Sequence, residues 1–131
     1  MLIKIDPILG PDVLHTLRAM GHGDKLILCD SNFPAYSMNS LVHRLDGVDA
    51  ARAAKAILSI LPLDSFVEFP ILRMQIDNKP DELNDVHREI IEVTKSVAGE
   101  NWKMGSIERF KFYEEAKKAF SIITTNETRP F

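Results

Sequence analysis

The sequence has little cysteine, few aromatic residues and no excess of positive charge. Its 131 residues include one cysteine and one tryptophan, and 8% of them are aromatic. One thiol cannot form a disulfide within the chain, so the protein must be stabilised by an apolar core, for which this length suffices. With 16 basic against 19 acidic residues, the net charge of -3 offers no broad positive field to a phosphate backbone. We therefore expect no nucleic acid as a partner.

Long apolar runs and the common glycine-rich motifs are also missing. No run approaches the roughly 20 residues that cross a bilayer, and residues 1–7 lack the apolar region of a signal peptide. We therefore expect a cytoplasmic protein with a single domain over residues 1–131 and no membrane partner. The absence of a phosphate loop, a dinucleotide-binding turn and a nucleophile elbow disfavours nucleotide and acyl-enzyme chemistry. The histidines are not spaced as metal ligands, so we expect no metal.

Helical and strand-like patterns alternate along the chain, which predicts a single α/β domain. Residues 31–40 contain turn-forming residues without a sustained period and are interpreted as an ordered loop. The apolar spacing predicts helices from Pro11 to Met20, after Asp49, from about 81 to 98 and over 110–120. Strands are expected at 25–30, 41–45, in parts of 65–76, near 102–107 and at 120–125.

Residues 20–30 carry the strongest candidate for chemistry. They predict a helix that stops at Gly21, a turn in which glycines flank His22, and a buried strand that ends on Asp30. Ligands bind at the carboxyl ends of strands in open α/β sheets, so Asp30 and the nearby His22 are candidates for acid–base chemistry on a polar small molecule. Cys29 lies inside the apolar run and is interpreted as a core residue rather than a nucleophile.

Three ordered segments share the pattern of one known family. They are Met-Gly-His-Gly-Asp at 20–24, Asp-x-x-Phe-Pro-Ala-x-Ser-Met at 30–38, and Arg-Phe-x-Phe-Tyr-Glu-x-Ala-x-Lys-Ala-Phe at 109–120. In these segments the chain resembles the fucose mutarotase branch of the ribose pyranase and fucose mutarotase family, and the similarity runs from Leu2 nearly to the C-terminus. The resemblance implies a three-layer α/β/α domain with a mixed, mostly parallel six-stranded sheet. It also implies homo-oligomers, decamers, with sites near subunit boundaries.

The same resemblance implies an isomerase that interconverts the α and β anomers of L-fucose or a related monosaccharide. Ring opening needs one group that protonates the ring oxygen and another that removes the anomeric hydroxyl proton, and it needs no cofactor. By resemblance, His22 is the proton donor, a task that suits histidine as a residue type, since an unperturbed imidazole with a pKa of about 6.5 can give or take a proton near neutral pH. Asp30 would accept hydrogen bonds from sugar hydroxyls, and Arg109 would bind hydroxyl oxygens with its fork of donors.

The candidate residues also have ordinary structural explanations. His22 could be a capping or surface residue, Asp30 could cap the next turn, and Arg109 could pair with Glu108 or Glu114 on the surface.

The aromatic candidates and the remaining histidines leave similar choices open. Phe33 and Tyr36 could anchor the core or a loop, or they could stack on the apolar face of a sugar and so bind substrate. His43 and His87 are interpreted as structural or solvated residues.

The sequence departs from the family pattern at its C-terminus. The family has a Tyr-x-Asn element in the sugar site, followed by a short strand, whereas here Phe131 stands at the aromatic position and the sequence stops. Phe131 keeps a stacking surface but lacks the hydroxyl, and it remains a candidate substrate-binding residue. Either the chain lacks its natural tail or this member has altered chemistry. The first is favoured, because residues 122–125 would otherwise lose a neighbouring strand.

Three other functions stay open. A ribose pyranase-like enzyme would exchange pyranose and furanose forms, although residues 33–38 look like the fucose branch. A non-catalytic sugar-binding or transport-accessory protein would keep the pocket without turnover. A purely structural oligomer would neither bind sugar nor accelerate exchange.

Overall fold

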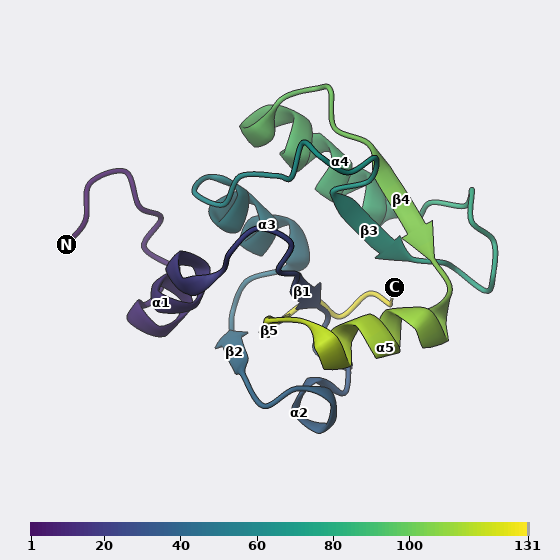
Figure 1. Cartoon of the computed structure of the whole chain (residues 1–131), viewed down its shortest axis with the longest axis horizontal. Coiled ribbons are helices and arrows are strands. Elements are labelled where there is room, and N and C mark those ends of the chain that lie inside the picture. Colours follow the sequence, from purple (N-terminus) through teal and green to yellow (C-terminus); the bar gives the residue numbers. More distant parts are fainter. Residues whose placement is uncertain (131) are drawn as a thin grey trace.

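The computed structural model describes residues 1–130, which form alternating helices and strands (Figure 1). The elements follow the order α-β five times along the chain. The helices are α1 (Pro11–Ala19), α2 (Ala35–Met38), α3 (Ala50–Leu58), α4 (Asp85–Ala98) and α5 (Arg109–Lys118). The strands are β1 (Leu26–Cys29), β2 (Val42–Leu45), β3 (Ile71–Met74), β4 (Met104–Ile107) and β5 (Ser121–Thr125).

The core lies on both faces of a parallel sheet with the strand order β1-β5-β2. Successive residues of a strand point to opposite faces, so the neighbours Ile122 and Ile123 of the central strand enter different clusters. Ile123 packs with α1 and α3, while Ile122 packs with Ala35 of α2 and Ala116 of α5. Helices therefore cover both faces, which gives the α/β/α layering around this sheet.

Local sequence explains where most helices begin. Pro11 begins α1, where its missing N–H costs no hydrogen bond. Asp49 caps α3 by accepting a hydrogen bond from the backbone of Arg52, and Glu108 caps α5 in the same way. At α4, the side chain of Asn84 accepts from the backbone N–H of His87, whose ring accepts in return from Asn84.

The expectation of one six-stranded sheet is wrong. In residues 1–130, β3 and β4 form a separate parallel pair, and three strands form the main sheet. The strands of both sheets pair in parallel. Among the described residues, an isolated bridge between Ile76 and Lys79 is antiparallel. The strand positions themselves are confirmed, but which strands pair depends on long-range packing.

Residues 126–130 follow β5 without forming a strand. The side chain of Glu127 accepts hydrogen bonds from the backbone N–H groups of Thr128 and Arg129, which a strand would direct to a neighbour. Pro130 has no N–H to donate. This local hydrogen bonding explains why no strand forms over these residues.

Two local expectations also need correction. The interpretation of residues 31–40 as a loop missed the single turn of α2, which begins after Pro34. Gly21 does not end α1, because the helix stops at Ala19 and Met20 is already extended with φ -62° and ψ 137°. The N–H of Gly21 instead donates to the carboxylate of Asp24 at 2.7 Å.

The predicted core position of Cys29 is confirmed. Cys29 is 7% exposed, and its Sγ lies 3.6 Å from the carbonyl oxygen of Ile123. Burial, with a smaller contribution from the charge of Asp30, raises the pKa of Cys29 to about 12. The thiol therefore stays protonated and acts as a small core side chain.

Gly105 of β4 lies against Phe69 and Leu72, and we expect Gly105→Ala to lower stability. A Cβ at this position would lie 2.7 Å from Cγ of Phe69 and 2.9 Å from Cδ2 of Leu72. Overpacking of this kind costs about 1–3 kcal/mol, which urea denaturation would measure. Gly10→Ala is the matched control, because nothing lies within 4 Å of its added Cβ. Equal stability of the two variants would contradict the predicted clash.

Candidate functional site

Asp30 lies at the carboxyl end of β1, and α5 starts with Arg109 at the same edge of the main sheet. Asp30 follows β1 directly, and Arg109 begins α5, the helix that leads back into β5. Asp30 is half-buried, and its Oδ1 accepts a hydrogen bond from the backbone N–H of Asn32 at 2.9 Å. The Asp30 carboxylate is thereby held in its loop while its other oxygen stays available for a ligand.

Arg109 is held by an aromatic side chain one helical turn away. Its Nε donates a hydrogen bond to the hydroxyl of Tyr113 at 2.8 Å, and its guanidinium carbon lies 5.4 Å from the Tyr113 ring centroid. Phe33 packs edge-on against Tyr113, with ring centroids 5.7 Å apart. Because Phe33 lies on the loop after Asp30, this packing joins the two candidate segments.

The aromatic candidates differ in their surroundings. Phe33 is half-buried and also packs edge-on against Phe112, so it anchors the loop to α5. Tyr36 of α2 is 66% exposed and its hydroxyl interacts with Arg44. Phe110 is 67% exposed next to Arg109. The anchor interpretation therefore describes Phe33 well, whereas Tyr36 and Phe110 present open ring surface.

His22 lies at the opposite end of β1 from Asp30. His22 lies in the turn before β1, and Asp30 follows β1. The length of β1 alone is about 10 Å at ~3.3 Å per residue. The side chain of His22 is 70% exposed, with Nε2 3.8 Å from Oδ2 of Asp64. Its ring packs edge-on against Phe66 at a centroid distance of 5.4 Å. The fold thus gathers Asp30, Phe33 and Arg109 within one chain and keeps His22 apart from them.

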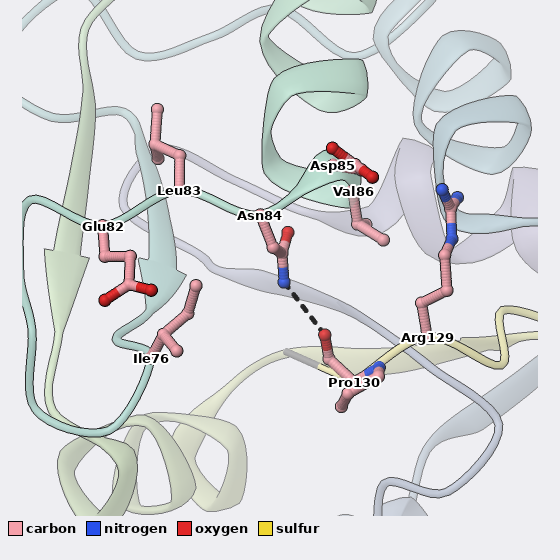
Figure 2. A pocket seen from close by; sticks show the side chains of 8 residues that line it. All are labelled: Ile76, Glu82, Leu83, Asn84, Asp85, Val86, Arg129 and Pro130. Atoms are coloured by element: carbon pink, nitrogen blue, oxygen red, sulfur yellow. Dashed lines mark hydrogen bonds between the residues drawn. The ribbon is translucent and has the colours of Figure 1, made fainter.

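A cavity of about 290 Å³ lies between the start of α4, the loop after β3 and the C-terminal segment (Figure 2). The side chain of Asn84 points across it and donates a hydrogen bond to the carbonyl oxygen of Pro130 at 3.0 Å. The cavity is lined by Ile76, Glu82, Leu83, Asn84, Asp85, Val86, Arg129 and Pro130. Phe131, a predicted binding residue, lies outside the described residues.

The buried carboxylate of Glu127 holds residues 126–130 in place beside the cavity. Glu127 is 4% exposed and accepts hydrogen bonds from Arg129, from the backbone of Ala50 and from its own segment. The Arg129 guanidinium, helped by these backbone N–H groups, lowers the pKa of Glu127 to about 2 despite burial. Arg129 also binds Glu89 of α4 through two bonds of 2.8 Å. Since Ser31 donates to the carbonyl of Glu127 at 2.9 Å, this network supports the loop that carries Asp30.

Sequence reasoning missed three groups of this site. Tyr113 lies four residues after Arg109 on a predicted helix, so their spacing could have revealed the pair. The approach of Asp64 to His22 and the Glu127–Arg129–Glu89 network join distant segments, and no local pattern indicates them. Among residues 1–130, no group of three or more His, Cys, Asp or Glu side chains could hold a metal ion.

Comparisons with known proteins cover nearly the whole chain. Residues 3–131 match the model of the RbsD / FucU transport protein family. An L-fucose mutarotase from Actinobacillus pleuropneumoniae is 38% identical over 129 residues, which are 97% of this chain and 88% of the relative.

Two solved structures extend the comparison to the fold. A protein to which sugar binding has been provisionally ascribed is 48% identical, with a TM-score of 0.94 over 98% of this chain and 89% of the other. The fucose mutarotase from Streptococcus pneumoniae, solved in complex with L-fucose, is 33% identical, with a TM-score of 0.85 over 97% of this chain and 90% of the other. Within the described residues, no helix is long and apolar enough to cross a membrane.

Proposed function

Since this chain belongs to the RbsD / FucU transport protein family, we propose that it interconverts the α and β anomers of L-fucose. The observation that carries the proposal is the near full-length similarity to proteins named L-fucose mutarotase, one of them at 38% identity. The position of Asp30, Phe33 and Arg109 at the carboxyl edge of the sheet adds support, because this edge is where ligands bind in such folds.

The proposed roles follow the chemistry of each side chain. His22 protonates the ring oxygen, so that the bond between this oxygen and the anomeric carbon breaks while a water molecule accepts the proton of the anomeric hydroxyl. Asp30 accepts hydrogen bonds from sugar hydroxyls through its available oxygen. Arg109 donates to hydroxyl oxygens through its terminal nitrogens, since Tyr113 already binds Nε. Phe33, Tyr36 and Phe131 supply ring surface for the apolar face of the sugar.

The separation of His22 from Asp30 favours a site built from two copies of the chain. Both ends are exposed: His22 is accompanied by Phe66 at 85% exposure, and Arg109 by Phe110 at 67%. Exposed aromatic rings next to polar groups are typical of surfaces that become buried in assemblies. We therefore propose that His22 of one subunit meets Asp30 and Arg109 of another in a homo-oligomer, with a decamer as the form that the family resemblance implies.

A mixing experiment tests the shared site. We expect His22→Ala and Arg109→Ala to be inactive alone and to regain activity when the two are dissociated and assembled together. If each site takes these residues from different subunits, random mixing restores both in about one quarter of the sites. Magnetization-transfer NMR of L-fucose would measure the recovered rate, and sedimentation would confirm mixed assembly. Mixed oligomers without recovery would show that one subunit supplies both residues.

The function itself is tested with the wild-type protein. We expect faster exchange between the anomeric protons of L-fucose in magnetization-transfer NMR, and a smaller effect on D-ribose. One relative of known structure has been described as sugar-binding, so a binding protein without turnover is the second candidate function. Binding of L-fucose without faster exchange would favour that second function, and faster exchange of D-ribose alone would indicate ribose pyranase activity.

A further inference from the structure

Asp64 is held beside His22 by a turn within its own loop. Its Oδ1 accepts a hydrogen bond from the backbone N–H of Phe66 at 2.8 Å, which fixes the carboxylate relative to the chain. Its Oδ2 lies 3.8 Å from Nε2 of His22. The Asp64 side chain is 28% exposed, compared with 70% for His22. One carboxylate oxygen therefore serves as an anchor, and the other faces the imidazole.

Phe66 contacts the same imidazole from another direction. Its ring is tilted by 75° to the His22 ring at a centroid distance of 5.4 Å, an edge-on arrangement that is favourable for aromatic pairs. The hydrogen bond that anchors Asp64 is made to the backbone of this same residue. The turn at 64–66 thus places a carboxylate and an aromatic ring against His22 together, and both restrict its rotation.

We propose that Asp64 is a positioning residue that determines which ring nitrogen of His22 carries the proton. The inference rests on the proposed role of His22 in sugar ring opening. A carboxylate facing Nε2 attracts a proton there, so the neutral ring keeps Nε2–H and presents Nδ1 for exchange with the sugar. At 3.8 Å the pair is longer than a hydrogen bond, so the interaction is electrostatic. When Nδ1–H of the imidazolium donates to the sugar, the neutral ring left behind is the form that Asp64 favours.

Asp64→Asn separates this role from that of a structural turn. Asparagine can still accept from Phe66 through Oδ1, but it then directs an NH₂ group toward His22 and favours a lone pair on Nε2. We expect nitrogen NMR of the imidazole to show the neutral-ring proton shifting from Nε2 to Nδ1. We also expect kcat for L-fucose exchange to fall about five-fold, as suits a partly exposed pair, with KM unchanged. Asp64→Glu keeps the charge and should keep the wild-type tautomer.

Glu92→Gln is the matched control, since Glu92 forms an ion pair of the same 3.8 Å length with Lys95 on α4. We expect it to change neither the His22 spectrum nor the exchange rate. An unchanged tautomer in folded Asp64→Asn would overturn the proposal. Failure of the proposed function is a separate result, namely wild-type protein that does not accelerate exchange, and the spectrum decides the effect of Asp64 on His22 in that case too.

Discussion

His22→Ala is expected to slow L-fucose anomer exchange by about 10²–10⁴-fold, the usual contribution of a positioned acid or base. Methyl has no proton to donate to the ring oxygen, and no other histidine lies on the same turn. Because the His22 side chain is 70% exposed, its removal leaves no cavity and should change stability by less than about 0.5 kcal/mol. Magnetization-transfer NMR measures the rate, and thermal unfolding checks the fold.

His15→Ala is the control for this prediction, because His15 is an exposed histidine of α1 outside the proposed site. It should retain the wild-type rate. A His22→Ala protein that folds, assembles and exchanges L-fucose at the full rate would remove His22 from the mechanism. Loss of activity in both variants would instead indicate a general effect on the assembly.

Glu127→Gln is expected to lower the free energy of unfolding by about 2 kcal/mol at neutral pH, because a buried carboxylate loses hydrogen bonds that it accepts from N–H groups. Glu127 is 4% exposed, and its carboxylate accepts hydrogen bonds from Ala50, Thr128 and Arg129. Glutamine keeps the shape but replaces one accepting oxygen with a donor, which leaves several of these N–H groups without their acceptor. Urea denaturation measures the loss.

The pH dependence of this difference follows from the pKa of Glu127, which falls from 4.5 to about 2 on folding. A group with a lowered folded pKa stabilises the protein above its unfolded pKa, so the contribution is complete above about pH 5 and is lost as the pH falls toward 2. The stability difference between wild type and Glu127→Gln should therefore shrink across this window. A difference that stays constant down to pH 2 would show that charge is not its cause.

Glu89→Gln is the comparison variant, because Glu89 is the other carboxylate that binds Arg129. Glu89 binds Arg129 through two bonds of 2.8 Å, but its side chain is 41% exposed. Exposed ion pairs contribute little to stability because solvent screens them, so this variant should be much closer to wild type than Glu127→Gln. Comparable losses in both variants would mean that the salt bridge to α4, rather than the buried carboxylate, holds the C-terminal segment.

The sequence predicts those elements whose signals are local. The cap at Asp49, the apolar run before Asp30 and the helix expected over 110–120 are each encoded within a few neighbouring residues, and the structure confirms them. Pairing of β3 with β4 apart from the main sheet involves strands far apart in the chain, and periodicity does not report which strands pair.

The same distinction applies to the candidate site. Asp30 could be predicted at the carboxyl edge because strand direction follows from the α/β pattern, and Arg109 reaches this edge at the start of α5. The separation of His22 from Asp30 could also be predicted, because the strand β1 lies between them, whereas the contacts of His22 with Asp64 and Phe66 could not, because these residues come from a distant loop. The proposed assembly has no local signal in the sequence and is inferred from exposed rings such as Phe110.

The burial of Cys29 makes the chain a convenient background for site-specific labelling. With a pKa of about 12, only about one thiol in ten thousand is ionised at pH 8, and maleimides and iodoacetamides react with the thiolate. A cysteine introduced at an exposed position, such as Glu92, would therefore react selectively while the native thiol stays silent. Fluorophores or spin labels attached there could test the proposed homo-oligomer by reporting distances between its subunits, without first removing the natural cysteine.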